Sequence, residues 1–142
     1  MGVYEKAVLV IDDAVGILDV VTIMLEMEGY EVVTALDASI ALAQIETTAP
    51  DLILLDVVLS TMSGYECIEQ LRQHHDAILI ILFTVLKHTP EEVEQLGVAG
   101  YLRKPFHRSG LLHQIKELLG DPGYALPEPG FRRDHSNAVL SC

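Results

Sequence analysis

The chain has 142 residues, of which half are hydrophobic, and its formal net charge at pH 7 is −12. This length is typical of one domain, and the apolar content is enough for a sizeable core. The acidic balance argues against direct binding of nucleic acid, because phosphate contacts need Lys and Arg. No apolar run approaches the roughly 18 residues of a membrane-spanning helix, and the N-terminus lacks a signal-peptide pattern. We therefore expect a cytoplasmic protein that does not bind membranes.

Short apolar runs alternate with stretches of helical periodicity over the first 120 residues. Strands are predicted at 7–11, 30–35, 51–55, 78–83 and 101–102. Helices are predicted at 14–28, from Ala38 to before Pro50, from Gly64 to His74–His75, from Thr89–Pro90 to Gly97, and over 111–119. Five strand–helix units with short connections predict an α/β fold: a doubly wound parallel sheet with helices on both faces.

Some local patterns refine this outline. Tyr65, Ile68 and Leu71 are expected on one stripe of the third helix. Cys67 falls in the same helical pattern and is expected to be a small core residue, since the two cysteines show no metal or disulfide spacing. From Asp121 the sequence becomes rich in Pro and Gly, which separates a domain at 1–120 from a tail or linker at 121–142.

Polar residues stand at the carboxyl ends of four predicted strands. Asp12 and Asp13 follow the first strand, Asp56 follows the third, Thr84 the fourth and Lys104 the fifth. Because the carboxyl ends of parallel strands meet at one edge of the sheet, these side chains are expected to converge there.

The residue types in this set indicate phosphoryl chemistry with a divalent cation. Three carboxylates held close repel each other, and a hard divalent ion relieves the repulsion. Mg²⁺ suits carboxylate, carbonyl and water ligands and keeps positions open for phosphate oxygens. Lys104 supplies a positive point charge and Thr84 a hydroxyl donor. Together these groups would neutralise a phosphoryl group attached to, or arriving at, a carboxylate.

Each of these residues also has an ordinary structural explanation. Asp56 favours turns, Asp13 can cap the helix that follows it, and Thr84 can simply end a strand. A lysine before a proline is weak information by itself. The joint spacing of the set is what favours the functional interpretation.

The combination resembles the receiver domain of two-component response regulators, including chemotaxis regulators. The matching segments are Val8–Asp13, Leu54–Gly64 and Gly100–Phe106, and the resemblance covers residues 7 to about 120. It implies a five-stranded parallel sheet in the flavodoxin-like order 2-1-3-4-5. It also implies a signalling module that is no enzyme beyond its own phosphoryl transfer and slow dephosphorylation.

The resemblance further implies how a metal and a phosphoryl group are held. Asp56 is the phosphoacceptor. Asp13 and Asp56 ligate Mg²⁺, or another divalent cation such as Mn²⁺, directly. Asp12 binds the ion mainly through water, and the main-chain carbonyl of Val58 adds a ligand. Lys104 contacts the phosphoryl oxygens.

The resemblance also implies a switch. The peptide bond from Lys104 to Pro105 is expected to be cis. Thr84 is expected to move toward the phosphoryl group, and Tyr101 to follow by turning inward. An ordinary strand aromatic is the alternative for Tyr101. The change would alter the surface formed by the last two helices and the last strand. A homodimer through that surface is compatible with the resemblance.

The expected partners follow from what the sequence lacks. No histidine kinase segment is present, so the phosphoryl group is expected from a histidine kinase, a phosphotransfer protein or a small phosphodonor. A downstream protein or output domain would read the change. Two positions depart from the family pattern. Ser60 stands where proline is common, so the loop after Asp56 is expected to be less rigid. The gap from Thr84 to Lys104 is short, which trims the fourth helix and so alters the usual output surface.

Two functions other than signalling are alternatives for this sequence. One is a Mg²⁺-dependent phosphohydrolase with an aspartyl nucleophile. Such hydrolases typically carry Asp-x-Asp after the first strand, whereas Asp12 and Asp13 are adjacent here. The other is a receiver that no longer accepts phosphate and only binds partners, which the intact set of acids, threonine and lysine argues against.

Overall fold

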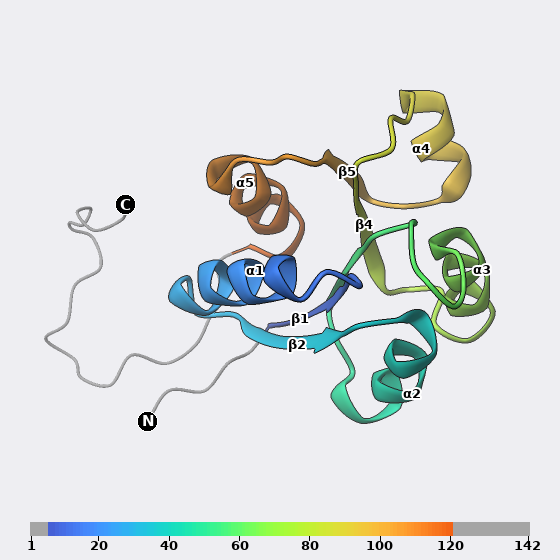
Figure 1. The fold of residues 1–142 in the computed structure, drawn as a ribbon, viewed down its shortest axis with the longest axis horizontal. Coiled ribbons are helices and arrows are strands. Elements are labelled where there is room, and N and C mark those ends of the chain that lie inside the picture. The colour runs from blue at the N-terminus through green and yellow to red at the C-terminus, as the bar shows by residue number, and fades with distance from the viewer. Residues whose placement is uncertain (1–5, 121–142) are drawn as a thin grey trace, which may run out of the picture.

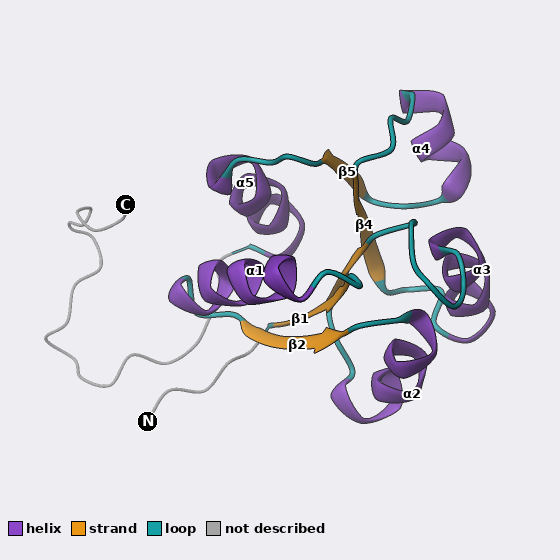
Figure 2. Cartoon of the chain, in the orientation of Figure 1, coloured by secondary structure: helices purple, strands orange, loops and turns teal. Residues whose placement is uncertain are grey.

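A computed structural model describes residues 6–120 of the chain. The predicted tail at 121–142 lies outside the described residues. Five strands form one sheet in the order β2-β1-β3-β4-β5, and every neighbouring pair is parallel (Figure 2). The strands are β1 (Ala7–Ile11), β2 (Glu31–Ala35), β3 (Leu52–Leu55), β4 (Leu79–Thr84) and β5 (Gly100–Arg103). The predicted order 2-1-3-4-5 is confirmed.

Each strand is followed by a helix: α1 to α4 connect successive strands, α5 follows β5, and helices lie on both faces of the sheet (Figure 1). They are α1 (Val15–Met27), α2 (Ala38–Thr48), α3 (Gly64–His74), α4 (Pro90–Leu96) and α5 (Arg108–Leu119). Helices α1 and α5 cover one face, and α2 and α3 cover the other. The doubly wound architecture predicted from the strand–helix alternation is therefore confirmed.

Strands β1 and β3 are apolar at every position, and β4 is apolar up to its last residue, Thr84, because both faces of the sheet are buried. In β1, Leu9 and Ile11 point into the core shared with α2 and α3, whereas Val8 and Val10 point into the core shared with α1 and α5. β3 and β4 alternate in the same way. Cys67 of α3 is fully buried, as predicted, and burial raises the pKa of its thiol to about 11.

The ends of α3 and α4 follow from their sequences. Ser63 caps α3 and Thr89 caps α4, each within a capping box. Helix α4 has only seven residues and buries none of them, in agreement with the predicted shortening. The predicted stripe on α3 was wrong at one position: Ile68 and Leu71 are buried, but Tyr65 lies at the edge of the stripe and is 40% exposed.

Helix α5 is attached to the C-terminal end of α1 through both its first and its last turn. Glu28, which follows α1, accepts hydrogen bonds from Arg108 at 3.0 Å and from Lys116 at 2.8 Å. The hydroxyl of Tyr30 donates to the carbonyl oxygen of Gly120 at 3.1 Å. These contacts attach α5 and Gly120 to the body of the domain. Within the described residues no helix is long and apolar enough to cross a membrane.

Candidate functional site

The strand register brings two of the predicted aspartates together. Ile11 of β1 pairs with Leu55 of β3, so the residues that follow them, Asp12 and Asp56, leave neighbouring strands at the same level. The backbone N–H of Asp56 also donates to the carbonyl of Ile11 at 3.0 Å. Both carboxylates are buried, with exposed fractions of 1% for Asp12 and 6% for Asp56. The predicted convergence at the carboxyl edge of the sheet is therefore observed for this pair.

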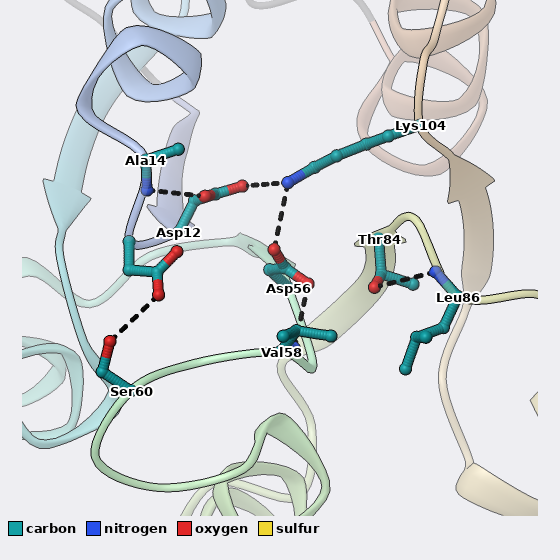
Figure 3. A network of polar contacts seen from close by, with 9 residues as sticks. Asp12, Ala14, Asp56, Val58, Ser60, Thr84, Leu86 and Lys104 are labelled. Atoms are coloured by element: carbon teal, nitrogen blue, oxygen red, sulfur yellow. Dashed lines mark hydrogen bonds and ion pairs between the residues drawn. The ribbon is translucent and has the colours of Figure 1, made fainter.

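Lys104 compensates the two buried carboxylates. Its backbone N–H donates to the carbonyl of Thr84 at 2.9 Å, which places the residue just beyond the end of β5. Its Nζ donates to Oδ2 of Asp12 and, at 3.0 Å, to Oδ2 of Asp56 (Figure 3). The ammonium also lies 4.8 Å from the centroid of the Phe83 ring. Buried charges of opposite sign in direct contact form a charge-assisted network.

The electrostatics of Lys104 reflect two opposing effects. Burial of the ammonium lowers its pKa, while the hydrogen bonds that it donates to Asp12 and Asp56 raise it, and the net result is a pKa above the ordinary lysine value. Lys104 is therefore charged throughout the physiological pH range. The peptide bond from Lys104 to Pro105 is cis, as predicted.

Backbone amides hold the remaining oxygens of the two buried carboxylates. Oδ1 of Asp12 accepts from the N–H of Ala14 at 2.9 Å, and Oδ1 of Asp56 accepts from the N–H of Val58 at 3.0 Å. With Lys104 on both Oδ2 atoms, each of these two side chains is fixed at both oxygens. The positions of both carboxylates are thus determined by groups that belong to the fold itself.

Asp13 is held differently from the other two aspartates. It does not cap α1, whose N-cap is Ala14 and carries no side-chain cap. Its Oδ2 accepts a hydrogen bond from Oγ of Ser60 at 3.0 Å, across the mouth of the site. Among residues 6–120, Oδ1 of Asp13 has no hydrogen-bond partner, which distinguishes it from the four oxygens of Asp12 and Asp56.

The donor set fits a hard divalent cation, although not as a cage of three carboxylates. No group of three or more His, Cys, Asp or Glu side chains that could hold a metal ion occurs in the described part of the chain. Mg²⁺ usually takes one or two carboxylates and fills its octahedron with water and carbonyl oxygens. Oδ1 of Asp13, the carboxylate of Asp56 and the carbonyl of Val58 are donors of these kinds, and in this structure the Asp56 oxygens are held by Lys104 and by the N–H of Val58. The sequence prediction of three converging carboxylates is thus met only in part: Asp12 and Asp56 meet on Lys104, whereas Asp13 is bonded to Ser60.

Thr84 lies on the side of Asp56 opposite to Asp12 (Figure 3). It is fully buried, and its Oγ1 accepts a hydrogen bond from the N–H of Leu86 at 3.3 Å. The Thr84 hydroxyl therefore supports the start of the β4–α4 loop. It has the right chemistry to donate to a group bound on Asp56 if that loop moves.

Tyr101 is attached to the same loop. Its hydroxyl donates to the carbonyl of Leu86 at 2.7 Å and accepts from the N–H of His88 at 3.2 Å. The ring of His88 packs on Tyr101 with centroids 5.2 Å apart, and its Nε2 lies 2.7 Å from the hydroxyl of Tyr65. Sequence reasoning found Tyr101 but missed His88 and Tyr65. A histidine four residues after a strand and an aromatic at a helix start carry no signal that would pair them.

Fold and site together are those of a flavodoxin-like signalling receiver. The sequence pattern of the response regulator receiver domain matches residues 8–116, and the chain belongs to that family. The chain is 35% identical, over 138 residues, to the alkaline phosphatase synthesis transcriptional regulatory protein PhoP of Bacillus subtilis; the match covers 96% of this chain and 58% of that protein. It is 34% identical over 116 residues to the DNA-binding dual master transcriptional regulator RpaA of Synechocystis, covering 79% and 48%. The chain thus spans about half the length of the curated relatives it matches.

Solved structures agree with this assignment. The chemotaxis protein CheY4 of Vibrio cholerae superposes with a TM-score of 0.73 at 32% identity, over 80% of this chain and 98% of that chain. The response regulator TrrA of Thermotoga maritima, solved in complex with Mg²⁺ and BeF, gives a TM-score of 0.73 at 30% identity with the same coverage. Both similarities extend over nearly the whole of the compared protein, so the shared unit is the receiver domain itself.

Proposed function

We propose that this chain is a phosphorylation-controlled receiver in which Asp56 accepts a phosphoryl group from a histidine kinase or a phosphotransfer protein. The observation that carries the proposal is the contact of the Lys104 ammonium with Asp12 and Asp56, buried at the carboxyl edge of the sheet. A carboxylate in this position is nucleophilic, and a lysine beside it is ready to neutralise the incoming phosphoryl oxygens.

The chemistry assigns one role to each residue of the site. An oxygen of Asp56 attacks the phosphorus of the donor, an acyl phosphate bond forms, and the bond to the donor's leaving group breaks. Lys104 then exchanges its contact with Asp56 for contact with the phosphoryl oxygens. Asp13, Asp56 and the carbonyl of Val58 would hold Mg²⁺, with Asp12 reaching it through water. When bound, the ion supplies positive charge at the phosphoryl group.

The signal would leave the site through the β4–α4 loop. Thr84 donates to the phosphoryl group once its hydroxyl turns away from the N–H of Leu86, and the loop moves with it. Tyr101, which is bonded to the carbonyl of Leu86, follows. The surface of α4, β5 and α5 therefore changes, and a downstream protein, an output domain or a second copy of the chain would read it. Such a relay would operate in the cytoplasm, and residues 121–142 would act as a tail or linker.

The test is phosphoryl uptake by the whole chain. We expect incubation with acetyl phosphate and Mg²⁺ to add one phosphoryl group, detected as a mass increase, and the Asp56→Asn chain to show none. The matched control is Asp51→Asn, since Asp51 stands before the same strand and bonds the N–H of Ala7 far from the site. Equal uptake by the Asp56→Asn chain would contradict the proposal, and steady release of phosphate from phosphate esters would favour the phosphohydrolase instead.

We expect the phosphoryl group on Asp56 to be long-lived. Val58 and Leu86 flank the site and are exposed, and neither side chain can orient a water molecule for attack on phosphorus. A side-chain amide can orient the attacking water in phosphoryl hydrolysis, as a glutamine does in GTPases. The decay of the phosphorylated chain with Mg²⁺ should therefore be slow, and Leu86→Gln should accelerate it. A lifetime of seconds in the parent chain would refute this expectation.

A further inference from the structure

We infer that Ser60 is a positioning residue for the divalent cation: its hydroxyl holds Asp13 in the orientation that the ion needs. The inference rests on the proposed function, because it concerns the cation that phosphoryl transfer to Asp56 would use. Ser60 lies in the loop between β3 and α3, and its Oγ is 3.0 Å from Oδ2 of Asp13. In Figure 3 this contact is the dashed line that ends at the Ser60 side chain.

Asp13 needs such a partner more than the other two aspartates do. Asp12 and Asp56 are buried and are fixed at both oxygens by Lys104 and by backbone amides. Asp13 is exposed, and Ser60 provides the hydrogen bond that it receives within the described residues. An exposed side chain without that bond would sample several rotamers, and the ion would have to bear the cost of ordering it.

The contact also leaves the ligand atom available. Ser60 donates to Oδ2, while Oδ1 of the same carboxylate has no hydrogen-bond partner within residues 6–120. The hydroxyl therefore orients the carboxylate without competing for its second oxygen. Outer-shell hydrogen bonds to a ligating carboxylate act in this way at metal sites.

A second effect comes from the separation of the two residues in sequence. Ser60 and Asp13 are 47 positions apart, so their hydrogen bond joins the β1–α1 loop to the β3–α3 loop. The β3–α3 loop also carries Val58, whose carbonyl is the third proposed ligand, and the N–H of Val58 bonds to Asp56. Ser60 thus restrains the distance between two loops that must both supply ligands to one ion.

The test measures cation binding without phosphorylation. Mg²⁺ is titrated into the whole chain by calorimetry, and Mn²⁺ binding is followed by electron paramagnetic resonance. We expect Ser60→Ala to weaken binding roughly three- to tenfold, at the lower end of outer-shell effects because the bond is exposed. Ser60→Thr, which keeps the hydroxyl, should bind within about twofold of the parent. Circular dichroism melting confirms that each variant is folded.

A double-mutant cycle separates this role from a general effect on the loop. If Ser60 acts through Asp13, Ser60→Ala should have no further effect on Mn²⁺ binding in an Asp13→Ala background, where position 13 has no side-chain oxygen to accept the hydrogen bond.

The remaining outcomes test the role of Ser60 and the proposed cation site separately. Unchanged or tighter Mg²⁺ binding by Ser60→Ala would overturn the inference and leave the proposed phosphoacceptor site standing. An equal loss in the Asp13→Ala background would also overturn it, because the effect would then not pass through Asp13. Failure of the parent chain to bind either ion would instead count against the cation site of the proposed function.

Discussion

Replacing Lys104 with methionine is expected to destabilise the chain by about 3–5 kcal/mol at pH 7 in the absence of divalent cations. Methionine keeps most of the side-chain volume and removes the charge. Asp12 and Asp56, both buried, would then face each other without the ammonium that now contacts them. Uncompensated buried charges of the same sign are among the few single changes that cost this much. Urea unfolding followed by circular dichroism measures the effect.

Magnesium should restore much of this loss. The carboxylates that Lys104 releases become available to a cation, so the Lys104→Met chain should bind Mg²⁺ more tightly than the parent and gain stability with rising Mg²⁺ concentration. Phosphoryl uptake should nevertheless be strongly reduced, because the charge that neutralises the phosphoryl oxygens is gone. Mg²⁺ would thus restore the stability of the Lys104→Met chain without restoring its phosphorylation.

Lys116→Met provides the matched control for this experiment. Lys116 also bonds a carboxylate, that of Glu28, but the pair is partly exposed on the surface between α1 and α5. Its loss should cost about 0.5 kcal/mol or less and should not depend on Mg²⁺. If Lys104→Met were as stable as Lys116→Met in EDTA, the buried contact of Lys104 would not have the energetic importance assigned to it.

Replacing Gly64 with alanine is the second change with a large expected effect, about 3 kcal/mol or more. A Cβ at Gly64 would lie 2.3 Å from Cα of Val57 and 2.8 Å from the carbonyl oxygen of Asp56. Both are backbone atoms, so no side-chain rotation relieves the contact. The N–H of Gly64 also bonds the carbonyl of Val57 at 2.9 Å, which keeps the loop closed.

The consequences of Gly64→Ala should extend to the site. The backbone that must shift belongs to Asp56 and its neighbour, so any protein that remains folded should take up the phosphoryl group more slowly. Gly16→Ala is the control: a Cβ there meets nothing within 4 Å, and in α1 it should stabilise the chain by about 0.5–1 kcal/mol. Urea unfolding of both variants checks the pair, and a Gly64→Ala chain as stable as Gly16→Ala would contradict the expected clash.

The fold could be predicted from the sequence because its signals are local and repeated. Each strand is a short apolar run and each helix a periodic stretch, so the alternation alone defined a doubly wound parallel sheet. The order β2-β1-β3-β4-β5 came from the resemblance to receiver domains and was confirmed. The error at Tyr65 shows the limit of periodicity: a residue at the edge of an apolar stripe can face solvent, and here it contacts His88.

The site could be predicted only to the level of which residues meet. Asp12, Asp56 and Lys104 follow strands whose ends coincide, so their convergence is a consequence of topology. The partner of each oxygen depends on rotamers and loop paths, which sequence spacing does not determine. Ser60 was noted only as a replacement for proline, and its contact with Asp13 joins residues 47 positions apart.

The bond between Tyr30 and Gly120 has a consequence for how a signal could be transmitted. Tyr30 immediately precedes β2, so it anchors the end of α5 beside the edge of the sheet where the strands begin. Asp56 lies at the other edge, across a sheet whose five-residue strand β1 spans roughly 16 Å. Any segment that continues from Gly120 therefore starts on the opposite side of the domain from the acceptor carboxylate. A kinase could approach Asp56 without meeting that segment. The conformational change that starts at Asp56 would have to pass through the body of the domain to reach that segment.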